Sequence, residues 1–131
     1  MRKDSSIKRN YQFRYIFKNA KPVRSYYTSV YIVKNRYKKI RLGITLNKQI
    51  KSAVDRNRAK RLIRESMNLL KKELKPGLDI VINLNHYNKD LKSNTIYLEL
   101  KNVFKKMDLL DEKYNDKNDW ILSKKPFTFY I

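Results

Sequence analysis

The spacing of apolar and polar residues along the 131-residue chain predicts three strands and three helices. Runs rich in β-branched and aromatic residues predict strands at 26–34, 40–46 and 78–84. Apolar residues three and four positions apart predict helices at 10–18, 52–74 and 93–107. This order is typical of an α+β domain whose helices cover the sheet mainly on one face. Gly43, in the middle of the second strand, predicts that another backbone approaches closely there.

The helix predicted at 52–74 has two unlike faces. At about 100° per residue, its apolar arc contains Ala59, Leu62, Ile63, Ser66, Leu69 and Leu70. The opposite arc contains Asn57, Lys60, Arg61, Arg64 and Lys71. One face can therefore be buried in a core while the other presents a ridge of cationic side chains. A polyanion is the natural partner for such a ridge, and RNA or DNA is the first candidate.

Residues at both ends of this helix support its boundaries. Ser52 and Asp55 form an S-x-x-D capping pattern, in which the carboxylate also favours the positive end of the helix. Lys75, Pro76 and Gly77 predict the point where the helix stops.

The composition strengthens the nucleic-acid interpretation. The chain carries 32 Lys and Arg against 12 Asp and Glu, a formal net charge of +20. An enzyme that acts on a neutral metabolite rarely needs so many like charges, which repel one another. A phosphate-binding protein gains affinity from them, because each neutralised phosphate releases counterions. Hydrophobic residues still make up 41% of the chain. A core is therefore possible, and the chain is not a disordered basic tail.

The chain contains few residues that could support nucleophilic, histidine-based or metal-dependent catalysis. The chain has no Cys, which excludes disulfides, thiolate nucleophiles and Cys-ligated zinc. Its single His, His86, excludes catalysis by a pair of histidines. The N-terminus is not typical of a signal peptide, and no apolar run approaches the roughly 18–20 residues of a membrane span. We therefore expect a cytoplasmic protein with no membrane partner.

The segment 111–131 differs from the rest of the chain. It gathers the acids Asp111, Glu112, Asp116 and Asp119 and ends in aromatic residues. These acids do not have the spacing of a calcium-binding loop, so we expect a loose surface segment, whose terminal aromatics could dock on the fold or pair as a strand. The predicted organisation is a single RNA-binding domain over 1–110 and a C-terminal extension of unassigned role over 111–131.

One long, ordered pattern resembles a known family. It reads Arg41-x-Gly43-Ile44-x-x-x-Lys48, then Ala53-Val54-x-Arg56-Asn57-Arg58-x-Lys60-Arg61-x-Ile63-Arg64-Glu65. Phe13-x-x-x-Phe17, Tyr31, the strand 78–84 and the final helix continue it. The pattern resembles the protein subunit of bacterial ribonuclease P over roughly residues 7–109, and it includes the Arg-Asn-Arg element after which that family's basic helix is named.

The resemblance implies a fold and a function. The fold is a two-layer α+β sandwich in the order α-β-β-(β)-α-β-α, whose mixed sheet of about four strands has a left-handed βαβ crossover instead of the usual right-handed one. The subunit binds the catalytic RNA of a ribonucleoprotein that removes the 5′ leader of precursor tRNA endonucleolytically, forming the mature 5′ end. The RNA performs this chemistry with Mg²⁺, no metal is assigned to the protein, and no obligatory protein partner is evident.

The resemblance also implies two binding surfaces. The residues expected to contact the catalytic RNA are Lys48, Arg56, Asn57, Arg58, Lys60, Arg61 and Arg64. Phe13, Phe17 and Tyr31 are expected to line a cleft for the single-stranded leader. The residues themselves leave another interpretation open, because two Phe four positions apart are equally typical of a helix that packs into a core.

The chain departs from the family pattern at two positions. Gln49 stands where a second lysine is usual, which weakens one phosphate contact. Asp55 places an acid just before the Arg-Asn-Arg element and lowers the local positive potential.

Three alternative functions fit parts of the sequence. A ribosomal or other structural RNA-binding protein would have this size and charge, but it would not need an aromatic leader cleft. A stand-alone metal-dependent nuclease would have to use Asp79, Asp90 or the acids after residue 110, which lie on different elements without ligand-like spacing. A protein of acidic membrane surfaces could use the basic helix, but that helix needs its apolar face for the core.

Overall fold

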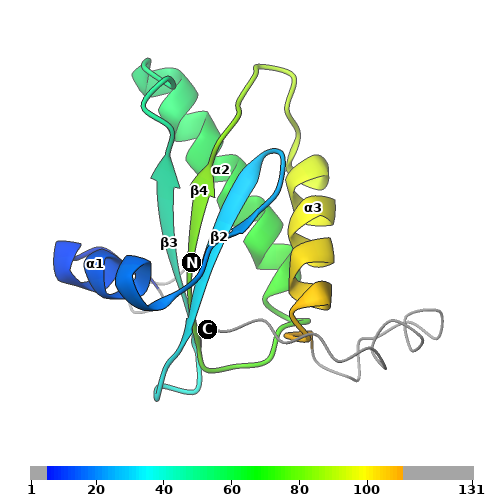
Figure 1. The fold of residues 1–131 in the computed structure, drawn as a ribbon. Helices are drawn as coiled ribbons and strands as arrows, with labels where there is room; N and C mark the ends of the chain where they lie inside the picture. The colour runs from blue at the N-terminus through cyan, green and yellow to red at the C-terminus, as the bar shows by residue number, and fades with distance from the viewer. Residues whose placement is uncertain (1–5, 111–131) are drawn as a thin grey trace.

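The computed structural model describes residues 6–110 (Figure 1). Its elements are α1 (Asn10–Asn19), β1 (Val23–Arg24), β2 (Thr28–Lys34), β3 (Ile40–Leu46), α2 (Ala53–Leu70), β4 (Leu78–Leu84) and α3 (Ser93–Lys106). The six predicted elements are all present, and the α+β fold is confirmed. The segment predicted to be a C-terminal extension, 111–131, lies outside the described residues.

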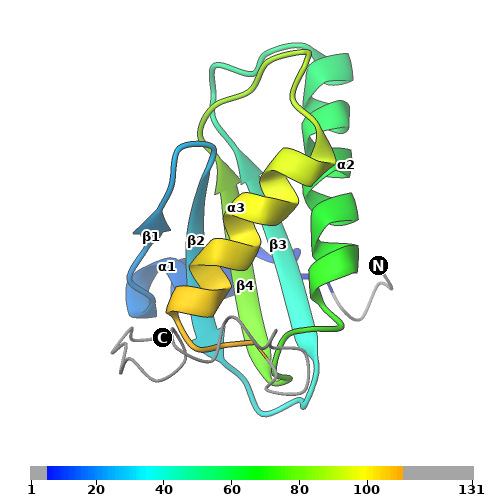
Figure 2. The ribbon, with the colours of Figure 1, turned by 90° about the vertical axis from the view of Figure 1, so that its right-hand side faces the viewer.

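The four strands form one mixed sheet in the order β1-β2-β4-β3. β2 pairs with both β1 and β4 in antiparallel fashion, whereas β3 and β4 are parallel neighbours connected through α2. In Figure 1 these two strands point upward with β4 to the right of β3, and Figure 2 shows that α2 lies behind the sheet of that view. The crossover is therefore left-handed, against the usual preference.

The additional strand, β1, lies before the first predicted strand and not after the second, where the order α-β-β-(β)-α-β-α placed it. The strand predicted from residue 26 begins only at Thr28, because the chain reverses just before it: the Ser25 amide donates to the Thr28 carbonyl over 2.7 Å. This reversal pairs Val23 and Arg24 with residues of β2. A strand of two residues is too short to leave a recognisable period in the sequence.

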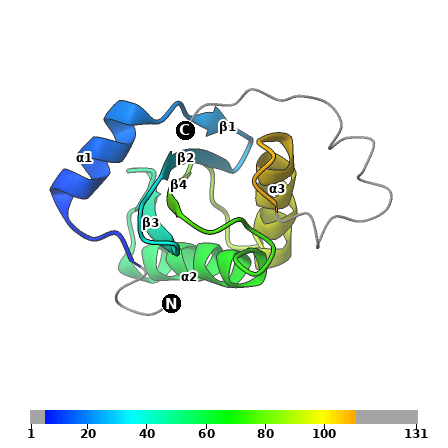
Figure 3. The ribbon, with the colours of Figure 1, turned by 90° about the horizontal axis from the view of Figure 1, so that it is seen from below.

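Helices lie on both faces of the sheet (Figure 3). α2 and α3 cover one face, where the large core includes Val30, Ile32, Ile80 and Ile82. α1 lies on the opposite face over a smaller core of Ile7, Ile16, Ala20, Val33 and Val81. Successive strand residues point to opposite faces, so neighbours such as Ile32 and Val33 belong to different cores. Two helices thus cover one face, as the sequence predicts, and α1 adds a partial layer on the other.

Helix α2 begins as predicted and ends early. The Ser52 hydroxyl accepts a hydrogen bond from the Asp55 amide at 3.0 Å, which confirms the cap. The helix ends at Leu70 and not at residue 74, because Leu74 is buried and forms a β-bridge with Leu110. This pairing satisfies backbone groups outside the helix. The predicted stop at Lys75–Gly77 is instead the turn that leads into β4.

The rotation of α2 also differs from the predicted arc. Leu69, placed on the apolar arc, is 57% exposed, whereas Met67, which the arc left out, is only 1% exposed. The helix packs against α3 as well as against the sheet. Because of this second neighbour, the buried face is centred nearer to Met67 than the pattern of apolar residues indicates.

A side chain, and not another backbone, approaches Gly43. A Cβ atom at this position would lie 2.7 Å from a ring carbon of Phe13 and 3.1 Å from Cβ of Ile7. Any larger residue would therefore push Phe13 away from the sheet. The glycine allows the aromatic ring to pack directly on β3.

Candidate RNA interface

The exposed face of α2 carries a basic ridge, which we define as Asn57, Lys60, Arg61 and Arg64. Asn57, Arg61 and Arg64 are exposed, and Lys60 is half-buried. No described residue forms an ion pair or a side-chain hydrogen bond with any of these four side chains. Their donors are thus available to an external anion. The ridge predicted from helical spacing is present on the surface.

Both arginines of the Arg-Asn-Arg element, Arg56 and Arg58, have partners within the protein. Arg58 donates to the Leu91 carbonyl at 2.6 Å and to the Tyr87 hydroxyl at 3.2 Å. Arg56 donates to the Ile50 carbonyl at 2.9 Å. Both side chains are half-buried. Each arginine therefore holds a loop next to the helix and has fewer N–H donors left for RNA. The spacing of residues in the sequence could not reveal these contacts.

A pocket of about 460 Å³ extends the ridge around the edge of the sheet. Its cationic lining residues are Lys8, Lys60 and Arg64. The N-terminal segment reaches this edge because the Ile7 amide donates to the Leu42 carbonyl of β3 at 2.9 Å. Lys8 is a residue that the sequence analysis missed, because only this contact between distant segments brings it beside α2.

Lys48 and Gln49 lie in the turn between β3 and α2, and both are exposed. The backbone N–H of Gln49 donates a hydrogen bond to Oδ1 of Asn47 at 2.9 Å, which shapes the turn. Lys48 is therefore at the end of the molecule where α2 begins. Gln49 lines a different pocket, together with residues of the loop after β4.

Phe13, Phe17 and Tyr31 form one aromatic cluster on the face of the sheet that α1 covers. The rings of Phe13 and Phe17 have centroids 6.2 Å apart, and Phe17 meets Tyr31 edge to face at 4.8 Å. Phe13 and Tyr31 are partly buried against the smaller core, whereas Phe17 is 41% exposed. The cluster therefore anchors α1 on the sheet and also presents an aromatic surface to solvent.

The basic ridge and the aromatic cluster adjoin each other at β3. Ile7 lines the pocket that contains Lys60 and Arg64, and it also belongs to the small core against which Phe13 and Tyr31 pack. One cationic surface and one aromatic surface are thus neighbours on a protein of net charge +20. Charge for phosphates beside rings for unpaired bases is typical of a single-strand nucleic-acid site.

Comparison with known proteins decides the family. The family model described as Ribonuclease P matches residues 1–108. The chain belongs to the ribonuclease P protein family. The ribonuclease P protein component of Clostridioides difficile is 35% identical over 104 residues, which cover 79% of this chain and 91% of that protein. The component of Staphylococcus epidermidis is 38% identical over 114 residues, covering 86% and 98%.

Solved structures of ribonuclease P proteins have the same fold. The protein from Staphylococcus aureus aligns with a TM-score of 0.71 at 30% identity and covers 82% of this chain and 98% of its own. The protein from Thermotoga maritima aligns with a TM-score of 0.65 at 28% identity, covering 75% and 93%. As a ribonuclease P protein component, the chain is a subunit of a tRNA-processing ribonuclease and has an RNA partner.

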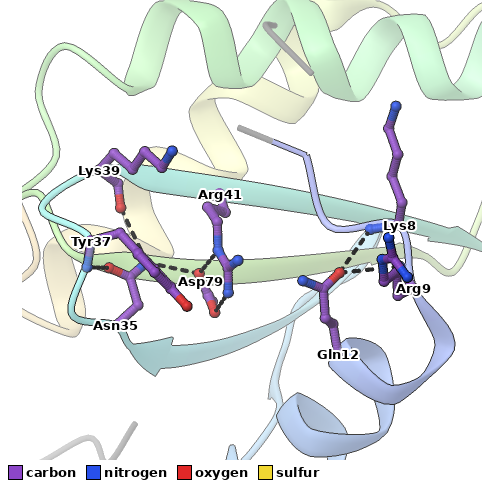
Figure 4. Close-up of polar contacts among 8 residues, drawn as sticks. All are labelled: Lys8, Arg9, Gln12, Asn35, Tyr37, Lys39, Arg41 and Asp79. Atoms are coloured by element: carbon purple, nitrogen blue, oxygen red, sulfur yellow. Dashed lines mark hydrogen bonds and ion pairs between the residues drawn. The ribbon is translucent and has the colours of Figure 1, made fainter. Parts of the chain in front are cut away.

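A partly buried ion pair holds the β2–β3 turn of this ribonuclease P protein in place (Figure 4). Arg41 donates two hydrogen bonds to Asp79, from Nε at 2.7 Å and from Nη2 at 2.6 Å. Asn35 donates a third to the same carboxylate, also at 2.7 Å, and the guanidinium lies 4.6 Å from the centre of the Tyr37 ring. The hydrogen bond to Asp79 raises the pKa of Arg41 above its ordinary value. The carboxylate of Asp79, a candidate nuclease acid, thus has a structural role as the hydrogen-bond acceptor of Arg41 and Asn35.

The remaining candidate acids gather into no site in the described part of the chain. Residues 6–110 contain no group of three or more His, Asp or Glu side chains that could hold a metal ion. Asp90 lies exposed in the loop before α3, on a different element from Asp79. The acids beyond residue 110 lie outside the described residues. None of the described helices is long and apolar enough to cross a membrane.

Proposed function

We propose that this ribonuclease P protein binds the catalytic RNA of its holoenzyme through the basic ridge and the single-stranded 5′ leader of precursor tRNA through the aromatic cluster. The observation that carries the proposal is that these two surfaces adjoin at the edge strand β3. Cationic side chains suit phosphates, and accessible aromatic rings suit unpaired bases. One bound protein can then hold a leader next to the catalytic RNA.

In this proposal the RNA, with its Mg²⁺ ions, hydrolyses the phosphodiester bond that joins the leader to the mature tRNA. The protein contributes binding: its cations lower the repulsion between two polyanions, which matters most when magnesium is scarce. Lys48, Arg56 and Arg58 would extend the contact from the ridge toward the start of α2. We assign Mg²⁺ to the RNA because the relation to the ribonuclease P family implies it.

A cleavage assay on a precursor tRNA at low magnesium tests this function. The reactions contain the protein alone, a bacterial ribonuclease P RNA alone, or both together. We expect strong formation of the mature 5′ end only in the mixture. Cleavage by the protein alone would contradict the assignment of catalysis to the RNA, and no stimulation by the protein would favour a structural RNA-binding role.

Replacing Phe17 by alanine is expected to weaken binding of precursor tRNA to the holoenzyme by about tenfold, since stacking on an aromatic ring contributes about 1–3 kcal/mol per base. Binding of mature tRNA, which has no leader, should change little. Phe17 is 41% exposed, so the fold should tolerate the change. The measurement is the dissociation constant of each tRNA from the assembled holoenzyme.

The matched control is Tyr15→Ala. Tyr15 is an exposed aromatic residue on the same helix, with 58% of its surface accessible, but it is not part of the aromatic cluster. We expect this variant to bind both tRNAs as the original protein does. Equal losses of precursor and mature tRNA for Phe17→Ala would mean that the cluster only packs α1 on the sheet.

A further inference from the structure

A second pocket, of about 580 Å³, lies at the end of the sheet where α2 begins. We call it the end pocket. Its walls come from the turn just before β2, the turn between β3 and α2, the first turn of α2 and the loop after β4. None of the family-implied binding residues lines it. Its size is ordinary for a site that binds a small organic group.

One wall of the end pocket is a stacked aromatic pair. The rings of Tyr26 and His86 are nearly parallel, at an angle of 10°, with centroids 4.6 Å apart. A 2.6 Å contact between Nδ1 of His86 and the Tyr26 carbonyl holds the two segments together. Tyr26 is 66% exposed and His86 is also exposed. A stacked and exposed pair of this kind can accept a further planar ring.

The lining of the end pocket also includes a carboxylate in a fixed position, that of Asp55. Asp55 Oδ1 accepts a hydrogen bond from the Tyr87 hydroxyl at 3.1 Å, and Arg58 donates to that hydroxyl at 3.2 Å. No described residue donates from its side chain to the second oxygen of Asp55. The exposed amide side chain of Gln49 lies in the same pocket. These groups can pair with the N–H donors and acceptors at the edge of a planar heterocycle.

The charges around the end pocket distinguish between ligands. A carboxylate repels a phosphate placed inside the pocket, which disfavours a free inorganic anion. Lys51 and Lys89, both exposed, also line the pocket and can interact with a phosphate near its opening. A planar base inside and a phosphate at the opening are the two halves of a nucleotide within an RNA strand.

We propose that the end pocket holds one unstacked RNA base, stacked on Tyr26 and His86, with its N–H edge toward Asp55 and its phosphate near Lys51 or Lys89. This inference rests on the proposed function and extends it, because it adds a base-binding site to a surface otherwise assigned to phosphates. The two departures from the family pattern then have a role. Gln49 and Asp55, which weaken phosphate binding, both face the base.

The test compares Tyr26→Ala and His86→Ala with the original protein for two ligands. These are a bacterial ribonuclease P RNA, bound by the protein, and a precursor tRNA, bound by the assembled holoenzyme. We expect about a tenfold loss of affinity for the RNA that supplies the base, as stacking energies imply. The dependence of affinity on salt should keep its slope, because no cation is removed. The ligand that is affected identifies the source of the base.

Two further variants make the test specific. His86→Phe keeps a flat ring and should retain the affinity that His86→Ala loses. Tyr37→Ala removes a tyrosine of similar exposure, 59% accessible, from the turn at the other end of β2 and should not change the affinity for either RNA. Unchanged affinity of both alanine variants for both RNAs, in a protein that still stimulates cleavage, would overturn this inference and leave the proposed function intact. A loss in His86→Phe as large as in His86→Ala would also overturn it.

Discussion

The double substitution Arg61→Ala, Arg64→Ala is expected to weaken binding of the catalytic RNA by at least about tenfold, since each charge-assisted contact contributes roughly 1.5–3 kcal/mol. It should also lower the slope of log affinity against log salt by about two, or about one per lost phosphate contact. Both side chains are exposed on α2, so the fold should be unaffected. Filter binding or fluorescence titration over a range of salt concentrations measures both quantities.

The matched control for this prediction is Lys92→Ala, Lys106→Ala. These exposed lysines lie at the two ends of α3, on a different helix from the basic ridge, and their removal changes the net charge by the same amount. The control should retain most of the affinity and nearly all of the salt slope. If the two double variants behave alike, binding follows net charge, and the ridge is not a specific contact surface.

Replacing Asp79 by alanine is expected to lower the free energy of unfolding by about 3 kcal/mol, since removing one partner leaves a buried charge uncompensated. Asp79 is only 6% exposed and accepts hydrogen bonds from Arg41 and Asn35. The substitution would leave the guanidinium beside β4 without its counter-charge. Urea unfolding followed by circular dichroism gives the change in stability.

A double-mutant cycle with Arg41→Ala separates the ion pair from the rest of the site. The double variant should lose clearly less stability than the sum of the two single variants, because no unpaired charge remains. Glu73→Ala provides a comparison with the second ion pair, in which Lys101 lies 3.4 Å from a more exposed carboxylate. That variant should cost less than about 1 kcal/mol. A similarly small loss for Asp79→Ala would show that Arg41 finds water instead.

The predicted elements agree with the structure where the pattern was long and local. Strands 40–46 and 78–84 have the predicted bounds, and the helices at 10 and 93 are correct to within one residue at each end. Errors have two causes. β1, which forms because Val23 pairs with Val30, is only two residues long and leaves no period in the sequence, whereas α2 ends early because a distant residue, Leu110, pairs with Leu74.

The candidate site was predictable as a set of residue types more than as an arrangement. Helical spacing correctly placed Arg61 and Arg64 on an exposed face, because this depends only on the period of α2. It could not show that Arg58 would be held by the Leu91 carbonyl. Nor could it place Lys8 in the pocket beside Arg64, since the β-bridge between Ser6 and Leu42 brings the N-terminal segment there.

By itself, the sequence determined the α+β class, the positions of the main helices and strands, the basic face of α2 and the resemblance to ribonuclease P proteins. These features depend on local periodicity, composition and an ordered motif. Only the tertiary structure decided the neighbouring positions of the basic ridge and the aromatic cluster and the existence of the end pocket. It also established the left-handed crossover, which the resemblance implied but no local pattern showed. Each of these features depends on contacts between residues far apart in the chain. Such contacts leave no periodic pattern in the local sequence, because they are selected by packing between separate elements.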